Sequence, residues 1–84
     1  MSRFDGLRQK LEEQKWPRVY MFKFIGEPQN VDKLKFLFQN AEVSVKASSK
    51  GKYQSFTAKM MMLNVDDVIK IYEEAAKIKG IVAL

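Results

Sequence analysis

The sequence predicts an α+β domain in which a four-stranded antiparallel sheet is covered on one face by two helices. Segments that alternate hydrophobic and polar residues, as half-buried strands do, are interleaved with segments whose hydrophobic residues recur at helical spacing. After one N-terminal helix, the order along the chain is strand, helix, strand, strand, helix, strand. A short turn joins the two central strands, which makes them antiparallel neighbours.

Composition limits the functions that this domain can have. The chain has 84 residues, enough for one small domain, and 46% of them are hydrophobic, which supplies one core. It contains no Cys and no His, which excludes disulfides, thiolate catalysis, the usual metal ligands and the usual general base. We therefore expect no cofactor, no metal and no enzymatic activity. We also expect a cytoplasmic protein, because no apolar run reaches about 18 residues and no secretory leader is evident.

Residues 1–16 are expected to form a helical extension. Phe4, Leu7 and Leu11 recur at helical spacing and give one hydrophobic stripe for docking on the rest of the protein. Trp16-Pro17 ends this helix, because the residue before a proline avoids the helical conformation. Residues 17–84 are then expected to form the domain itself.

The first strand is expected at residues 18–25. Tyr20, Phe22 and Phe24 occupy alternate positions, so their side chains should share the buried face of the sheet. Met21 and Lys23 should point to the opposite face.

The first crossover helix is expected to begin at Asn30, a good N-cap residue, and to end near Asn40. Phe36 falls off the hydrophobic stripe of this helix, either at its edge or facing something outside the chain. The stripe itself consists of Val31, Leu34, Leu37 and Phe38.

The central hairpin is expected to join strands at residues 42–48 and 53–63. Gly51 can take a positive φ without strain, so the turn should fall at residues 49–52. Met61 should be exposed, since neighbouring residues of a strand point to opposite faces. The hydrophobic side chains expected to face the helices are Val43, Val45, Phe56, Ala58 and Met60.

The second crossover helix is expected to start at Asn64. This residue would cap free amide groups, and Asp66 and Asp67 would lie in the first turn, where the helix dipole favours acids. Gly80 should end the helix, and residues 81–84 should form a short last strand. The expected buried stripe consists of Val65, Val68, Ile69, Tyr72 and Ala76.

This order of elements is the split βαβ, or ferredoxin-like, arrangement βαββαβ. The first and third strands should be central, with the shorter second and fourth strands at the edges. The helices would cover one face of the sheet and leave the other open. We expect the open face and the hairpin to provide a surface for a partner or ligand, formed by Lys23, Lys46, Ser48, Ser49, Lys50, Gly51, Lys52, Tyr53, Ser55 and Thr57.

The hairpin also resembles part of a known family. Residues 48–55, with the sequence SSKGKYQS, resemble the Ser-Ser-Lys-Gly-x-Tyr-x-Ser signature of the small bacterial YbeD-like proteins, also called the domain-of-unknown-function 493 family. Residues 23–26 look like that family's first-strand ending, and residues 71–74 resemble its second-helix Tyr-Glu-Glu. The resemblance covers residues 17–84, although the segment before Asn40 looks shorter here.

The resemblance implies a ferredoxin-like fold close to the ACT regulatory domains. Such domains bind amino acids or other small effectors and pair through sheets or helices. A role in lipoate metabolism is sometimes attached to the family, and no ligand-binding residue is implied for this chain.

These features favour a small regulatory or interaction module that acts through a protein partner or a small effector. The net charge of +5 favours anionic partners, and residues 50–52 would present amide and ammonium groups to an anion. A structural explanation also exists, because Gly51 permits the turn and the lysines keep its tip soluble. Tyr53 is expected to be contact surface. Met21 and Met61 would also suit a homodimer.

RNA binding is the alternative function. RRM domains share this order of elements, and residues 50–53 resemble the start of the RNP1 motif. RNP1 requires an aromatic residue directly after its glycine and another two positions later, where this chain has Lys52 and Gln54. The aromatic residues of the first strand are also committed to the core, so we do not expect nucleic acid as the partner.

An enzyme is the third class considered, because acylphosphatases use this fold. An acylphosphatase would need an arginine after the first strand, where residues 26–29 have none.

Overall fold

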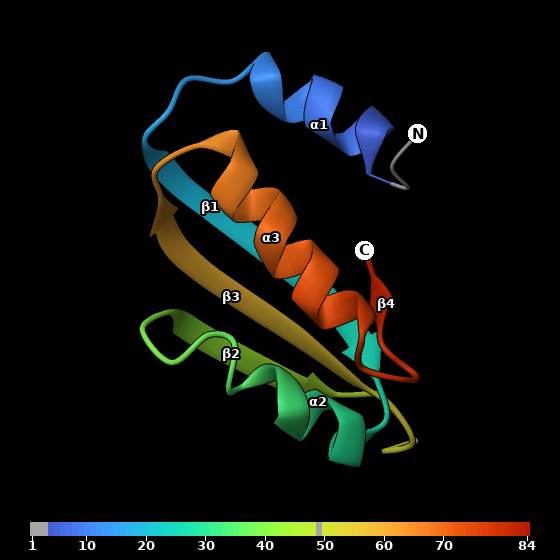
Figure 1. Cartoon of the computed structure of the whole chain (residues 1–84). Coiled ribbons are helices and arrows are strands. Elements are labelled where there is room, and N and C mark those ends of the chain that lie inside the picture. Colours follow the sequence, from blue (N-terminus) through green and yellow to red (C-terminus); the bar gives the residue numbers. More distant parts are fainter. Residues whose placement is uncertain (1–3, 49) are drawn as a thin grey trace.

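Four strands form one antiparallel sheet in the computed structural model, which describes residues 4–48 and 50–84 (Figure 1). The order across the sheet is β2-β3-β1-β4. The first and third strands are therefore central and the second and fourth lie at the edges, as predicted. The strands are β1 (Arg18–Gly26), β2 (Glu42–Ala47), β3 (Gln54–Met62) and β4 (Val82–Ala83).

The two faces of the sheet are as different as the alternation predicted. Phe22 and Phe56 are fully buried at 0% exposure, and Phe24 lies directly opposite Phe56 on the same face. Lys23 and Thr57 are opposite each other on the other face. Aromatic residues at alternate positions of β1 therefore direct the sheet's packing, because their burial is the largest hydrophobic gain open to this strand.

Both crossover segments cover the same face. The ring of Phe38, which follows helix α2 (Pro28–Leu34), lies 5.1 Å from the ring of Phe22 between centroids. The ring of Tyr72, from helix α3 (Val65–Ala76), lies 5.4 Å from Phe22 on the same face. Tilted aromatic pairs of this kind contribute about 0.5–1.5 kcal/mol each beyond their burial. The core is therefore an aromatic cluster between the sheet and two chain segments.

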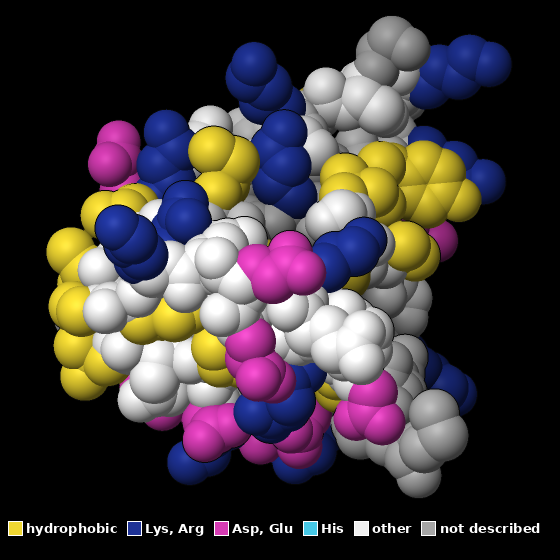
Figure 2. All heavy atoms as spheres, turned by 90° about the horizontal axis from the view of Figure 1, so that it is seen from above, with side chains coloured by type: hydrophobic (Ala, Val, Ile, Leu, Met, Phe, Trp, Pro, Cys, Tyr) yellow, Lys and Arg dark blue, Asp and Glu magenta, His cyan; other side chains and the backbone are white. Residues whose placement is uncertain are grey.

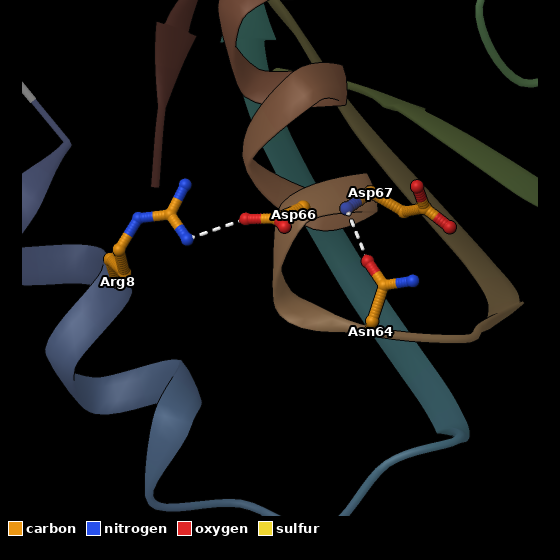
Figure 3. A network of polar contacts seen from close by, with 4 residues as sticks. All are labelled: Arg8, Asn64, Asp66 and Asp67. Carbon is orange, nitrogen blue, oxygen red and sulfur yellow. Dashed lines mark hydrogen bonds and ion pairs between the residues drawn. The ribbon is translucent and has the colours of Figure 1, made fainter.

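The N-terminal helix α1 (Asp5–Glu12) packs on α3 (Figures 1 and 3). Leu11 is buried in the common core, and the indole Nε1 of Trp16 donates a hydrogen bond of 2.9 Å to the carbonyl oxygen of Leu11. The guanidinium of Arg8 lies 2.6 Å from the carboxylate of Asp66, at the start of α3. This hydrogen bond raises the pKa of Arg8. The extension is thus docked on the domain by both apolar and ionic contacts.

The first crossover helix starts earlier and ends earlier than predicted. Glu27, not Asn30, is its N-cap residue, and Pro28 occupies the first turn. The backbone amide of Asn30 donates to the carbonyl of Glu27 at 2.9 Å, so Asn30 is already inside the helix. Proline explains the shift, because its fixed φ suits a first helical position and its missing N–H would have no partner there.

After Leu34 the chain continues as turns rather than as α-helix. The amide of Leu37 donates to the carbonyl of Leu34, and the amide of Ala41 donates to the carbonyl of Phe38. Hydrogen bonds between residues three apart are typical of turns tighter than an α-helix. Phe38 is nevertheless buried, as predicted, whereas Phe36 is 76% exposed. The hydrophobic anchor of this segment was therefore correctly identified although its helical extent was not.

Val43 and Val45 were expected to face the helices, and their direction is as predicted, but the helices do not bury them. Every residue of β2 is exposed, and these two valines retain 38% and 37% of their accessible surface. They do point to the helix-covered side, since they lie opposite Ala58 and Phe56. The short α2 packs over β1 and β3, however, and leaves β2 without a cover.

Helix α3 begins as predicted. The side chain of Asn64 accepts a hydrogen bond of 2.9 Å from the backbone amide of Asp67, as Figure 3 shows. One residue of the expected stripe is corrected, because Ala75 is buried and Ala76 is exposed. Ala75 lies three residues after Tyr72, a spacing that keeps it on the same helix face.

The last strand is shorter than residues 81–84, since β4 spans Val82–Ala83. The chain approaches β1 closely at this point. A Cβ added to Gly26 would lie 2.6 Å from Cδ1 of Ile81 and 2.9 Å from the carbonyl oxygen of Gly80. Glycine at the end of β1 is therefore required by the return of the chain from α3.

Candidate functional site

The open face of the sheet carries the central residues of the expected surface. Residues directly opposite each other in an antiparallel ladder point to the same side, so the side chains form rows across the strands. Thr57 of β3 lies opposite Lys23 of β1 and Ser44 of β2. Ser55, one row nearer the hairpin, lies opposite Lys46. The sheet thus brings together groups that are more than thirty residues apart in the sequence, such as Lys23 and Thr57.

Two shallow hollows adjoin on this face, and we call them together the open-face depression. The larger has a volume of about 330 Å³ and is lined by Met21, Lys23, Glu42, Val43, Ser44, Lys46, Thr57 and Lys59. The smaller has a volume of about 140 Å³ and is lined by Lys23, Ser44, Lys46, Ser55, Phe56, Thr57 and Leu84. Four residues line both hollows: Lys23, Ser44, Lys46 and Thr57.

The depression is rich in hydrogen-bond donors. Ammonium groups come from Lys23, Lys46 and Lys59, and among the described lining residues Glu42 is the single acid. An ammonium group donates hydrogen bonds and accepts none, so three of them favour a ligand rich in acceptors and negative charge. Hydroxyl groups, which can donate or accept, come from Ser44, Ser55 and Thr57.

The hairpin residues have structural roles that the sequence also allowed. Gly51 has φ +71°, and its amide donates a hydrogen bond of 2.9 Å to the carbonyl of Ser48. The amide of Ser48 bonds to the carbonyl of Tyr53 at 2.8 Å, and the Ser48 hydroxyl accepts from the amide of Tyr53 at 3.3 Å. Ser48 and Gly51 therefore close the turn. Ser49 lies outside the described residues.

The remaining hairpin residues are exposed but do not line the depression. Tyr53 is 41% exposed and lies just before β3 rather than in it. The Nζ atom of Lys52 lies 5.4 Å from the centre of the Tyr53 ring, a cation–π distance. Lys50 is exposed at the turn. The structure therefore brings together Lys23, Lys46, Ser55 and Thr57, and places Ser48 and residues 50–53 beside this group rather than in it.

Leu84, like Glu42, is a lining residue that sequence reasoning missed. Its backbone amide donates a hydrogen bond of 2.9 Å to the carbonyl of Lys23, which extends the pairing of β4 with β1. The antiparallel return of the last strand beside the first was the available signal, because it places the end of the chain next to the middle of β1. Met21 was expected on the open face, and Ser44 and Lys59 share that face by alternation with Lys46 and Thr57, but none of these three is among the expected site residues.

A further hollow lies outside the open-face depression. It has a volume of about 410 Å³ and lies between the end of β3 and α3. Its lining is mainly apolar, with acids and one lysine contributed by α3: Met60, Met61, Met62, Leu63, Asp67, Lys70, Ile71 and Glu74. Met61 is exposed, as predicted. Figure 2 shows hydrophobic side chains gathered at the left margin, which is the end of the sheet where β1 begins and β3 ends (Figure 1).

Tyr20 and Tyr72 share a hydrogen bond of 3.1 Å between their hydroxyl oxygens. Burial, followed by this hydrogen bond, raises the pKa of Tyr72 above its ordinary value, so its phenol stays protonated. Within residues 4–48 and 50–84, no three His, Cys, Asp or Glu side chains gather as metal ligands.

The fold and the depression define a class: an α+β domain whose antiparallel sheet is covered on one face and cationic on the other. Among the helices that the structure describes, none combines the length and hydropathy needed to cross a bilayer. A family model described as "Protein of unknown function (DUF493)" matches residues 12–84. The chain belongs to this family. Residues 48–55 resemble the signature of the family. No curated protein matches the chain.

Proposed function

We propose that this protein is a small regulatory or interaction module that binds a small anionic effector in the open-face depression. The observation that carries the proposal is the convergence of Lys23, Lys46 and Lys59 around a shallow hollow with one acid, Glu42, in its lining. Ammonium groups that line the same hollow give it a positive potential, which a bound anion would neutralise.

We further propose that the fold is ferredoxin-like and close to the ACT domains. The sheet order read from its other edge, β4-β1-β3-β2, supports this assignment, as do two crossover segments on one face. The absence of Cys and His from the sequence supports a binding protein rather than an enzyme. The proposed setting is the bacterial cytoplasm, following the family resemblance, with carboxylates such as lipoate among the effectors to be tested.

The site is tested by titration with small anions followed by amide NMR. Amino acids, lipoate, nucleotides and inorganic phosphate are the probes, and the largest shifts are expected at Lys23, Ser44 and Thr57. Replacing Lys23 and Lys59 together by Gln should weaken binding by about tenfold or more, because two charge-assisted contacts are lost. The matched control replaces Lys10 and Lys79, exposed lysines of α1 and the segment after α3, by Gln, which gives the same net charge.

The outcome that contradicts the proposal is equally specific. If the anions bind but shift the amides around Met60 and Ile71 instead, the ligand occupies the hollow between β3 and α3. If both lysine pairs weaken binding equally, the attraction is one of net charge and not of a site. If no probe binds at millimolar concentration, a small anionic effector of these classes is excluded and a protein partner becomes the better candidate.

Tyr53 provides a test of the hairpin as contact surface. Replacing Tyr53 by Ala should cost less than about 0.5 kcal/mol of unfolding free energy, because its side chain is 41% exposed. Binding of an effector or partner that touches the hairpin should weaken. A large loss of stability would show that Tyr53 supports the fold rather than a contact.

RNA binding remains the alternative function, favoured by the cationic open face. It is the weaker proposal because Tyr20, Phe22 and Phe24 lie on the helix-covered side, where they cannot stack on bases. Titration with single-stranded RNA at two salt concentrations separates the functions. Micromolar binding that weakens steeply with salt would favour RNA.

A further inference from the structure

The outer edge of β2 is unprotected. β2 pairs with β3 on one side, and no strand of the described chain lies on its other side. All six residues of β2 are exposed, and their pairing with β3 continues without a bulge from Glu42 to Ala47. Exposed, regular edge strands are templates for pairing with another strand, and proteins usually block them with bulges, proline or a covering segment.

The hydrogen bonding in the hairpin shows which residues of β2 direct their backbone groups to the outer edge. The amide of Ser48 points to β3, since it donates to the carbonyl of Tyr53. Backbone groups alternate in direction along an antiparallel strand, so Lys46 and Ser44 also direct theirs to β3. Val45 and Val43 therefore direct their amide and carbonyl groups outward, where another strand would bind them.

The sequence of β2 is complementary to itself. Glu42-Val43-Ser44-Val45-Lys46 has the same hydrophobic pattern in both directions, and its ends carry opposite charges. When two copies are placed antiparallel about Ser44, Glu42 of each lies opposite Lys46 of the other. Val43 of each then lies opposite Val45 of the other. Both valine pairs have their backbone groups directed outward, which is the requirement for hydrogen-bonded pairs.

Neighbouring registers lose this match. Centring the pair on Val45 places Lys46 opposite Ser44, and centring it on Lys46 places two lysines face to face. Opposite charges across strands stabilise a sheet and like charges destabilise it, so charge selects the register centred on Ser44.

We propose that β2 pairs with β2 of a second copy, antiparallel about a two-fold axis at Ser44, so that two four-stranded sheets form one continuous sheet. About four new backbone hydrogen bonds and two cross-strand ion pairs would form. The pairing also covers the two valines, 38% and 37% exposed, that α2 leaves bare. Lys23, Lys59 and Thr57 stay on the open face, whereas Lys46 and Glu42, which also line the depression, would each pair with a charge of the second copy. The pairing itself requires no bound effector.

Cysteine cross-linking tests the register, because the natural chain has no Cys. Ser44→Cys should give a disulfide-linked dimer under mild oxidation, since residues opposite each other in a non-hydrogen-bonded pair have Cα atoms about 4.5 Å apart. Lys46→Cys is the matched control on the same face of the same strand. It should not cross-link alone, because Glu42 lies opposite, but it should cross-link when mixed with Glu42→Cys. Equal cross-linking of Ser44→Cys and Lys46→Cys alone, or none with Ser44→Cys, would overturn the proposal.

Charge reversal tests the ion pairs by sedimentation velocity. Lys46→Glu and Glu42→Lys should each raise the dimer dissociation constant by roughly tenfold or more, because two attractive pairs become repulsive. An equal mixture of the two variants should associate again, since each supplies the charge that the other lacks. Glu73→Lys, a reversal at an exposed position on α3, should leave association unchanged.

The proposal is overturned if the natural chain stays monomeric up to about millimolar concentration, because a dimer with a weaker dissociation constant would be negligibly populated. Recovery of folded variants that do not associate when mixed would also overturn it. Glu42→Lys places a lysine opposite Lys59, so circular dichroism checks its fold, and the cysteine variants decide the outcome if it unfolds.

Discussion

The two crossover segments cover the sheet unequally. Helix α3 has 12 residues, is capped by Asn64 and packs against α1. Helix α2 has 7 residues and continues as turns to Asn40. The central strands β1 and β3 are consequently buried on one face, whereas β2 is exposed on both. Alternation tells which way a side chain points, and a cover on that side is what buries it.

The largest expected effect tests whether the turns after α2 are a real part of the cover. Replacing Phe38 by Ala should cost about 3–5 kcal/mol of unfolding free energy, because the ring is 2% exposed and contacts the rings of Phe22 and Phe56. Phe36→Ala, two residues away and 76% exposed, should change stability by less than about 0.5 kcal/mol. Urea denaturation measures both.

A loss of about 3–5 kcal/mol is large enough to unfold a small domain, so Phe38→Leu provides a milder change that should cost about 1.5 kcal/mol. Equal effects at Phe38 and Phe36 would contradict the assigned packing of this segment.

The next effect compares a valine buried beneath α3 with a valine on the uncovered strand β2. Val68→Ala, in the buried face of α3, should cost about 2 kcal/mol, from lost burial and the cavity left behind. Val43→Ala should cost less than about 0.5 kcal/mol in the monomer, because Val43 already contacts water. A cost at Val43 that grows with protein concentration would indicate that a second copy covers it.

A smaller effect distinguishes the two helix starts. Asn64→Ala should cost about 1 kcal/mol, because the amide of Asp67 loses its partner. Asn30→Ala should have little effect, since Glu27 rather than Asn30 precedes the first turn of α2. Thermal denaturation of both variants checks the prediction, and a greater loss at Asn30 would reinstate it as a cap.

The smallest effect at neutral pH concerns the hydroxyl pair beneath α3. Tyr72→Phe removes one hydrogen bond to Tyr20 and should cost at most about 1 kcal/mol. Folding raises the pKa of Tyr72 above its ordinary value of 10.0, so the folded state holds the phenolic proton more tightly than the unfolded chain does. Its contribution to stability is therefore full below pH 10 and is lost as the pH rises through the folded pKa.

The stability of the natural protein should consequently fall more steeply above pH 10 than that of Tyr72→Phe. Lysine deprotonation affects both proteins alike, so the difference between their profiles isolates Tyr72. Parallel profiles would mean that this phenol titrates similarly in the folded and unfolded states.

The candidate site was predicted in part. Lys23 and Thr57 were placed on the open face from alternation alone, because period-two patterns give the direction of a side chain without knowledge of its neighbours. Most of the expected site residues lie in the hairpin at residues 48–55, yet the depression is formed by rows across three strands. Leu84 joined it through backbone pairing with Lys23, a contact that no local pattern encodes.

The amino-acid pattern alone determined the number of strands, their directions, the aromatic face of β1 and the cap of α3, because these depend on residues a few positions apart. Tertiary structure decided how far α2 extends, which valines are bare and which lysines meet on the open face. Those outcomes depend on how much of the sheet each crossover segment covers. That coverage is set by packing between segments that lie far apart in the chain.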